Sequence, residues 1–186
     1  LCEEIIRENL KIEFLIETHL KNLDDELIIL LKRAGLKMVY VGIESSNSTV
    51  LKNINRFTVN NDQQYQIIKK LKKNRIYVKS MFMFGLPDDT EETIKKTIQY
   101  SKFLPNQLVQ FSVFTPYPGT PSHNELSDKI IVQKLEKHNQ YNLVYKHKFL
   151  NNEMIIKLKN IGYRKFYLDL RNLFVIFLSL ISFFRK

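Results

Sequence analysis

The sequence predicts an α/β fold in which four parallel strands form a sheet with helices packed against it. Two observations predict it. Four apolar runs, rich in β-branched and aromatic residues, alternate with helical segments over short connections, and this order calls for parallel strands joined by right-handed crossovers. The runs are also nearly continuous in apolar residues, which is typical of strands covered on both faces. A tail with helical character follows the last run.

The strands are expected within four segments whose composition favours β-structure. These segments are residues 11–20, 37–44, 76–87 and 107–118. Gly85 and Pro87 cut off the third strand. Pro116 and Pro118 stop the fourth, because proline fixes φ and lacks a backbone N–H. The first strand, at 12–16, has no earlier partner in the sequence, and we expect it to be an exposed edge.

The helices are expected between the strands, and their ends carry recognisable signals. They lie at residues 2–9, 24–35, 60–74 and 90–104. Asp24 or Asp25 can cap the start of the second helix, and Gly35 can end it. Asp89, answered by Glu92, predicts a capping box at the start of the fourth.

Size and composition are those of one globular domain. The chain has 186 residues, of which 44% are hydrophobic and 26% charged, and these values exclude a globally disordered protein. The single cysteine, Cys2, excludes an internal disulfide and a site with several thiolate ligands within this chain. The net charge of +10 fits a solvated lysine-rich surface or attraction to an anionic partner. Because no arginine-rich run accompanies it, no nucleic-acid partner is expected.

Small, polar and proline residues follow the carboxyl ends of the predicted strands, and in parallel barrels these ends carry the chemistry. Glu44 directly follows the second strand. Its carboxylate could accept hydrogen bonds from vicinal hydroxyls of a ligand, or it could be a solvated loop residue. Arg56, twelve residues later, could bind a ligand carboxylate through two hydrogen bonds or lie free on the surface. The proline-rich segment 115–120 predicts a rigid wall of the same site.

Three segments together identify a family resemblance. They are "LLKRAGLKMVYVGIESSNSTVLKNINRFTV", "YVKSMFMFGLPDDTEETIKKTI" and "FSVFTPYPGTP". In this order and spacing they resemble the second half of the radical S-adenosylmethionine (SAM) enzyme core, most closely in the group with an N-terminal cobalamin-binding domain. The resemblance implies that residues 1–121 form an open arc of a TIM-type barrel, and that 122–186 form a helical extension.

The resemblance also implies a set of cofactor contacts. Glu44 would contact the ribose of SAM, and Arg56 would hold its methionine carboxylate. The residues expected at the cofactor are Glu44, Ser45, Arg56, Met81, Gly85, Phe114 and Thr115, the last two through their backbone. No catalytic or metal-ligating residue is expected in this chain.

The function implied by the resemblance belongs to a larger enzyme. A [4Fe-4S] cluster would cleave SAM to a 5′-deoxyadenosyl radical or, with cobalamin from an upstream domain, support methyl transfer. The C-x-x-x-C-x-x-C loop that ligates the cluster is not in this sequence. The expected partner is therefore an N-terminal half of the same parent chain, and the substrate is not identified. The alternative is a non-catalytic α/β binding or membrane-associated module.

An apolar segment lies near the end of the chain. Residues 173–184 include twelve positions, too few to span a bilayer. They could form a buried helix or lie at a membrane surface, where neighbouring basic residues would meet anionic headgroups. A cytoplasmic protein, with peripheral membrane contact as an option, is the expectation.

Overall fold

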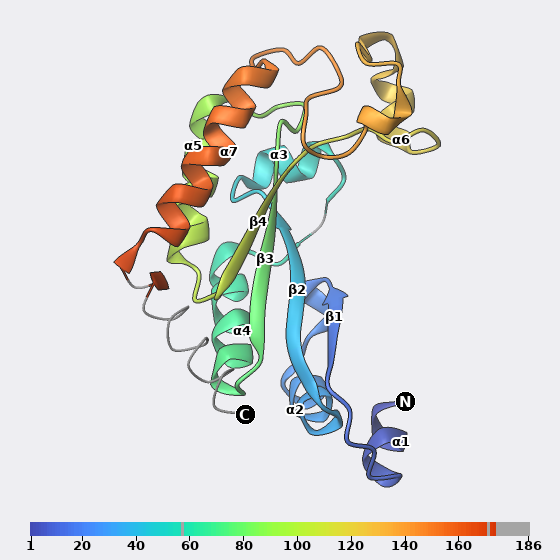
Figure 1. Cartoon of the computed structure of the whole chain (residues 1–186), viewed down its shortest axis with the longest axis vertical. Coiled ribbons are helices and arrows are strands. Elements are labelled where there is room, and N and C mark those ends of the chain that lie inside the picture. Colours follow the sequence, from blue (N-terminus) through green and yellow to red (C-terminus); the bar gives the residue numbers. More distant parts are fainter. Residues whose placement is uncertain (57, 171, 174–186) are drawn as a thin grey trace.

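The computed structural model describes residues 1–56, 58–170 and 172–173, and its centre is one parallel sheet (Figure 1). The strands are β1 (Phe14–Thr18), β2 (Leu36–Glu44), β3 (Tyr77–Phe84) and β4 (Leu108–Val113). They pair in the order β1-β2-β3-β4, and every pair is parallel. This confirms the predicted α/β fold with an open arc of four parallel strands, consistent with part of a TIM-type barrel.

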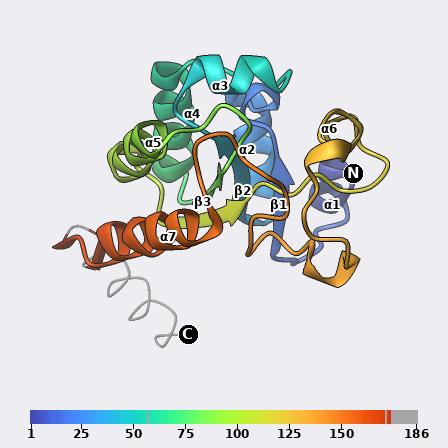
Figure 2. The same ribbon diagram turned by 90° about the horizontal axis from the view of Figure 1, so that it is seen from above.

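Helices cover one side of this sheet (Figure 2). They are α2 (Asp25–Ala34), α3 (Ser48–Asn53), α4 (Asn61–Lys73) and α5 (Glu91–Phe103), with α1 (Cys2–Arg7) before the first strand. Asp24 caps α2 by accepting a hydrogen bond from Leu27 N–H, and Gly35 ends it in the left-handed conformation. The short α3, capped by Asn47, was not predicted.

The predicted capping box of α5 is wrong in its residues. Thr90 is the N-cap, and the Thr90 and Thr93 side chains satisfy each other's backbone N–H groups. Asp89 accepts hydrogen bonds from Leu86 N–H and the Thr93 hydroxyl instead. Its carboxylate thus stabilises the turn after β3 rather than the helix.

The two faces of the sheet differ in burial. Along β3, every second side chain from Val78 to Phe84 is buried against the helices. The side chains between them, including Lys79 and Met81, face the concave side and are partly exposed. The prediction that both faces are covered is therefore wrong for this chain, because an arc of four strands leaves the inner face of the barrel open.

The tail is helical only in part. It contains α6 (Pro121–Glu125) and α7 (Asn152–Tyr167), and 3-10 turns at Ser127–Lys129 and Leu135–Lys137; another such turn, Leu20–Asn22, follows β1. The remainder of 126–151 is mostly irregular. Ile155, Leu158 and Phe166 of α7 join the same hydrophobic core as the strands. The barrel arc and the tail therefore share one core.

The C-terminal apolar segment lies almost entirely outside the described residues. Of positions 173–184, the structure describes only Leu173. Within the described part of the chain, no helix is both long and apolar enough to cross a membrane. The expected membrane contact through this segment stays a prediction.

The outer edge of β4 is closed by two side chains of α7. The Tyr163 hydroxyl bonds both the N–H and the C=O of Phe111, and the Tyr167 hydroxyl does the same at Val109, at 3.1–3.3 Å. Gln140 C=O accepts from Val113 N–H. The outward-facing groups of the strand are thus satisfied without a fifth strand. At the other end, no strand among the described residues pairs with the free edge of β1, as expected.

Candidate functional site

An ion pair lies at the carboxyl end of β2. Glu44 is the last residue of the strand, follows a bulge in its register with β3, and has a positive φ of 63°. Arg56 follows α3, and its Nη2 lies 2.9 Å from Glu44 Oε1. The sequence predicted that both would lie at this rim, and the structure places them there. Their role as cofactor contacts stays a prediction.

Gly42 leaves the space that this pair occupies. A Cβ atom at position 42 would lie 2.5 Å from Glu44 Oε1 and 2.8 Å from Arg56 Nη2, closer than unstrained contacts allow. Any larger residue would therefore displace the two charged groups. Met81 lies opposite Gly42 in the register of β3 and faces the same concave side.

Burial makes the site electrostatically unusual. The pKa of Glu44 is raised mainly by desolvation, which the charge and hydrogen bond of Arg56 partly offset. The Arg56 guanidinium makes the ion pair through Nη2, whereas its buried Nε has no hydrogen-bond partner among the described residues. A buried N–H without an acceptor is costly. A carboxylate-bearing ligand would supply the missing acceptor.

Two of the other predicted residues have side chains engaged elsewhere. The Ser45 hydroxyl is buried, 3.3 Å from Thr97 Oγ1 of α5, and it accepts from Asn47 N–H. It faces the helices rather than the concave side. The Thr115 hydroxyl donates to Val113 C=O. For these residues, only backbone groups are positioned to meet a ligand.

The backbone of Phe114 is also partly committed. Its N–H donates to Phe84 C=O at 2.9 Å, which extends the β3–β4 pairing by one residue, and its ring packs edge-on against Tyr145. Because this N–H is already used, a contact with an adenine edge would have to come from the other backbone groups of Phe114 and Thr115, and that contact stays a prediction. Beyond it, Gly119 has a positive φ of 84°, and Thr120 caps α6. The wall predicted at 115–120 stays a prediction.

Gly85 forms a turn that is held from both sides. Its φ is 78°, and a Cβ there would meet Ile155 Cδ1 at 2.8 Å. Asp89 accepts from the backbone N–H groups of Gly85 and Leu86. Tyr145 donates to Gly85 C=O and His147 to Leu86 C=O, at 2.7 and 2.8 Å. Gly85 therefore shapes the rim through its backbone, and its Cα faces the tail.

Sequence reasoning missed the three residues that hold this turn. Asp89 had a signal, since an acid shortly after Gly-Leu-Pro can accept from the turn's N–H groups, but it was assigned to the helix. Tyr145 and His147 lie about 60 positions along the chain. No local pattern in the sequence points to them.

Comparison with known proteins decides the family. The model of the radical SAM superfamily matches residues 1–101, more than half of the chain. The chain belongs to the radical SAM superfamily. The match includes β1, β2, β3 and the Glu44–Arg56 pair, so the residues implied by the resemblance lie largely inside the matched region.

The curated relatives are proteins of larger size. This chain is 28% identical over 170 residues to the anaerobic magnesium-protoporphyrin IX monomethyl ester cyclase of Rubrivivax gelatinosus, covering 90% of this chain and 30% of the relative. It is 29% identical over 133 residues to the bacteriochlorophyllide d C-12(1)-methyltransferase of Chlorobaculum tepidum, covering 71% of this chain and 29% of the relative. The chain therefore spans about a third of the length of these relatives.

Solved structures share the fold. The cobalamin- and [4Fe-4S]-bound radical SAM methyltransferase TsrM of Kitasatospora setae superposes with a TM-score of 0.63 at 20% identity, over 68% of this chain and 27% of TsrM. Coproporphyrinogen III oxidase of Escherichia coli, a radical SAM enzyme, superposes with a TM-score of 0.60 at 16% identity, over 87% of this chain and 35% of the oxidase. At these identities the likeness concerns the fold alone.

The cofactors that the superfamily implies fit this radical SAM chain unequally. The Arg56 Nε without an acceptor suits the carboxylate of SAM, and the Glu44 carboxylate suits its ribose hydroxyls. A cluster held by three thiolates does not fit, because the chain has one cysteine. Among the described residues there is also no group of three His, Cys, Asp or Glu that could hold a metal. No step through the cluster is derived from this chain.

Proposed function

We propose that this chain is the part of a radical SAM enzyme that binds the ribose and methionine ends of SAM. The observation that carries the proposal is the Glu44–Arg56 pair, half-buried at the rim of the sheet beside Gly42. When bound in a complete enzyme, SAM supplies a methyl group or, after reductive cleavage, a 5′-deoxyadenosyl radical. The names of the relatives, two of which are a cyclase and a methyltransferase, support chemistry of this class.

The residues would exchange partners when the cofactor binds. Glu44 would turn its carboxylate from Arg56 to the ribose hydroxyls, which donate hydrogen bonds. Arg56 would donate to the methionine carboxylate, and this acceptor would also satisfy its buried Nε. Hydrogen bonds in which one partner is charged are stronger than neutral ones, so the exchange keeps both charged groups compensated.

The cluster and any cobalamin would come from another part of the enzyme. The free edge of β1 is the place where a further strand of the barrel would pair, because β4 is closed by α7. An N-terminal half of the parent protein is the partner that this edge suits. The site would then lie inside the completed barrel.

Calorimetry of SAM binding tests the proposal. We expect Glu44→Gln and Arg56→Gln each to weaken binding to the chain by about 1–3 kcal/mol, the range for losing a hydrogen bond to a charged group. Gly42→Ala should weaken it as well, by displacing both groups. Glu92→Gln, an exposed acid paired with Lys96 on α5, is the control. SAM bound equally by all four variants would overturn the assignment.

A further inference from the structure

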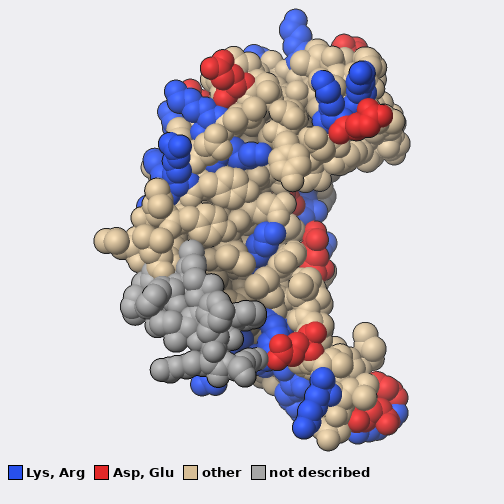
Figure 3. Space-filling model, in the orientation of Figure 1, with Lys and Arg blue, Asp and Glu red and all other residues tan. Residues whose placement is uncertain are grey.

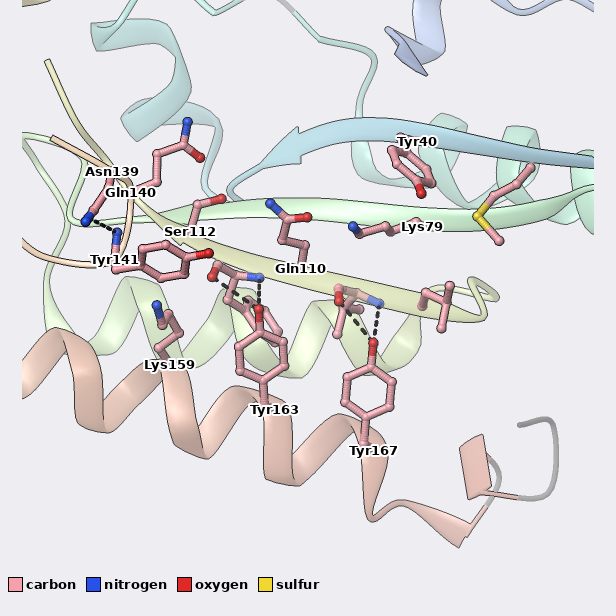
Figure 4. Close-up of a pocket in the computed structure, with 14 residues that line it drawn as sticks. Tyr40, Lys79, Gln110, Ser112, Asn139, Gln140, Tyr141, Lys159, Tyr163 and Tyr167 are labelled. Carbon is pink, nitrogen blue, oxygen red and sulfur yellow. Dashed lines mark hydrogen bonds between the residues drawn. The ribbon is translucent and has the colours of Figure 1, made fainter. Parts of the chain in front are cut away.

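A cavity of about 580 Å³ opens on the concave face beside β4 (Figure 4). Side chains of the sheet, including Tyr40, Lys79 and Gln110, form its floor. Tyr141, from the irregular part of the tail, and Lys159 of α7 form its wall. Glu44 and Arg56 do not line it, so the cavity is separate from the ion pair. No sequence motif marked these residues.

The charges in the cavity have one sign. Lys79 and Lys159 are among the residues that line it, and no Asp or Glu is. Among the described residues, neither lysine forms a salt bridge, although eight such pairs occur elsewhere in the chain. Elsewhere on this side of the molecule, acidic and basic side chains are scattered together over the surface (Figure 3). Two cations without an acidic partner among the described residues therefore line one open cavity.

Each of these cations lies over an aromatic ring. Lys79 Nζ is 4.6 Å from the centre of the Tyr40 ring, and Lys159 Nζ is 5.0 Å from that of Tyr141. Such contacts hold an ammonium group in place without neutralising it. Burial lowers the pKa of Lys159, so an anion brought close to it would relieve part of the desolvation cost.

The rest of the lining suits a flat, ring-bearing molecule that also makes hydrogen bonds. Met38, Leu108 and the rings of Tyr40 and Tyr141 give apolar surface, while Gln110 and Ser112 offer hydrogen bonds. The hydroxyls of Tyr163 and Tyr167 are bound to the backbone of β4, so these rings act as walls. Polar groups placed beside aromatic rings in a cavity of this size can fix the orientation of a small molecule.

We propose that this cavity binds a flat, ring-bearing organic anion, with Lys79 and Lys159 meeting its carboxylate groups. The inference rests on the proposed function, since such a molecule would be the substrate on which the SAM-dependent site acts. The tail would then supply part of the substrate site, through Tyr141 and Lys159, while the strands supply the cofactor site.

The test uses two fluorescent probes of the same ring system. Pyrenebutyrate carries a carboxylate, and pyrenebutanol is its neutral counterpart. We expect the chain to bind pyrenebutyrate about tenfold more tightly than pyrenebutanol, the scale of a charge-assisted contact. Lys79→Gln and Lys159→Gln should each lower pyrenebutyrate affinity about five- to tenfold, with little effect on pyrenebutanol.

Two further measurements distinguish a contact made by the two cavity lysines from a general effect of positive charge. Lys157→Gln removes an exposed lysine of α7 that does not line the cavity, and it should bind both probes like the wild type. SAM affinity should be unchanged in Lys79→Gln. If the probe experiment fails while SAM still binds, the proposed function therefore stands. Equal affinity for the two probes, or wild-type binding by both cavity variants, would overturn the inference.

Discussion

At the scale of single residues, the site at the carboxyl ends of β2 and β3 depends on two glycines that lack a side chain. Gly42 provides no side chain, and the carboxylate of Glu44 and the guanidinium of Arg56 take that space. Gly85 provides a turn that a residue with Cβ would strain, since its φ is positive and Ile155 lies against it. In both places a backbone requirement sets where charged or hydrogen-bonding groups can lie.

Asp89 should make the stability of the chain depend on pH. Burial raises its pKa from 3.8 to about 6, so the folded state binds the proton more tightly than the unfolded state. The stabilisation from this proton is complete below about pH 4 and is lost as the pH rises through 6. At about 1.36 kcal/mol per pKa unit, the loss is about 3 kcal/mol.

Asp89→Asn removes this titration while keeping an acceptor for the turn. We therefore expect its free energy of unfolding, relative to wild type, to rise between pH 4 and pH 7 by up to about 3 kcal/mol. Urea denaturation at a series of pH values measures it. Asp128→Asn, at an exposed position of the tail, is the control. A pH-independent difference between wild type and Asp89→Asn would contradict the expectation.

At the scale of elements, α7 replaces a strand at the edge of β4. We expect Tyr163→Phe and Tyr167→Phe each to cost about 1 kcal/mol, because each removes a hydroxyl that bonds both a backbone N–H and a C=O. Hydrogen exchange of the Phe111 and Val109 amides should quicken in the respective variant. Tyr141→Phe, whose side chain is exposed, should change neither amide. Unaltered exchange in all three would show that water or backbone relaxation replaces the hydroxyls.

The elements were predictable where a local period or cap defines them. The apolar runs located all four strands, and Asp24 and Gly35 located both ends of α2. The six-residue α3 was missed because it is too short and polar to show a helical period. The tail was only partly predicted, because its course depends on contacts with β4 and the Gly85 turn rather than on its own sequence.

The site was also predictable only in part, where the position of a residue at a strand end determines its place in the fold. Glu44 follows from the rule that carboxyl ends of parallel strands meet at one edge, whereas Arg56 was placed beside it by the family resemblance. Ser45 was included as a neighbour of Glu44, although adjacent residues at a strand end face opposite sides. Lys159 and Tyr141 could not be found, since only the folded tail brings them to the sheet.

At the scale of the whole molecule, the two edges of the sheet are unlike. The free edge of β1 should promote self-association of the chain in solution, because an unpaired strand edge is a template for pairing. Leu15, which is 55% exposed on this strand, should report on it: Leu15→Lys is expected to lower the average mass in sedimentation. Leu168→Lys, at the exposed end of α7, is the control. A wild-type chain that is monomeric at all concentrations would count against an open edge.

The closure of β4 by α7 also affects the chain while it is being synthesised. The tyrosines that seal the strand follow their partners by 52 and 58 residues. At a synthesis rate of roughly 5–20 residues per second, the edge of β4 stays open for about 3–12 s after the strand itself is made. During that interval the growing chain offers a second template for pairing, and translation speed through the tail determines how long it persists.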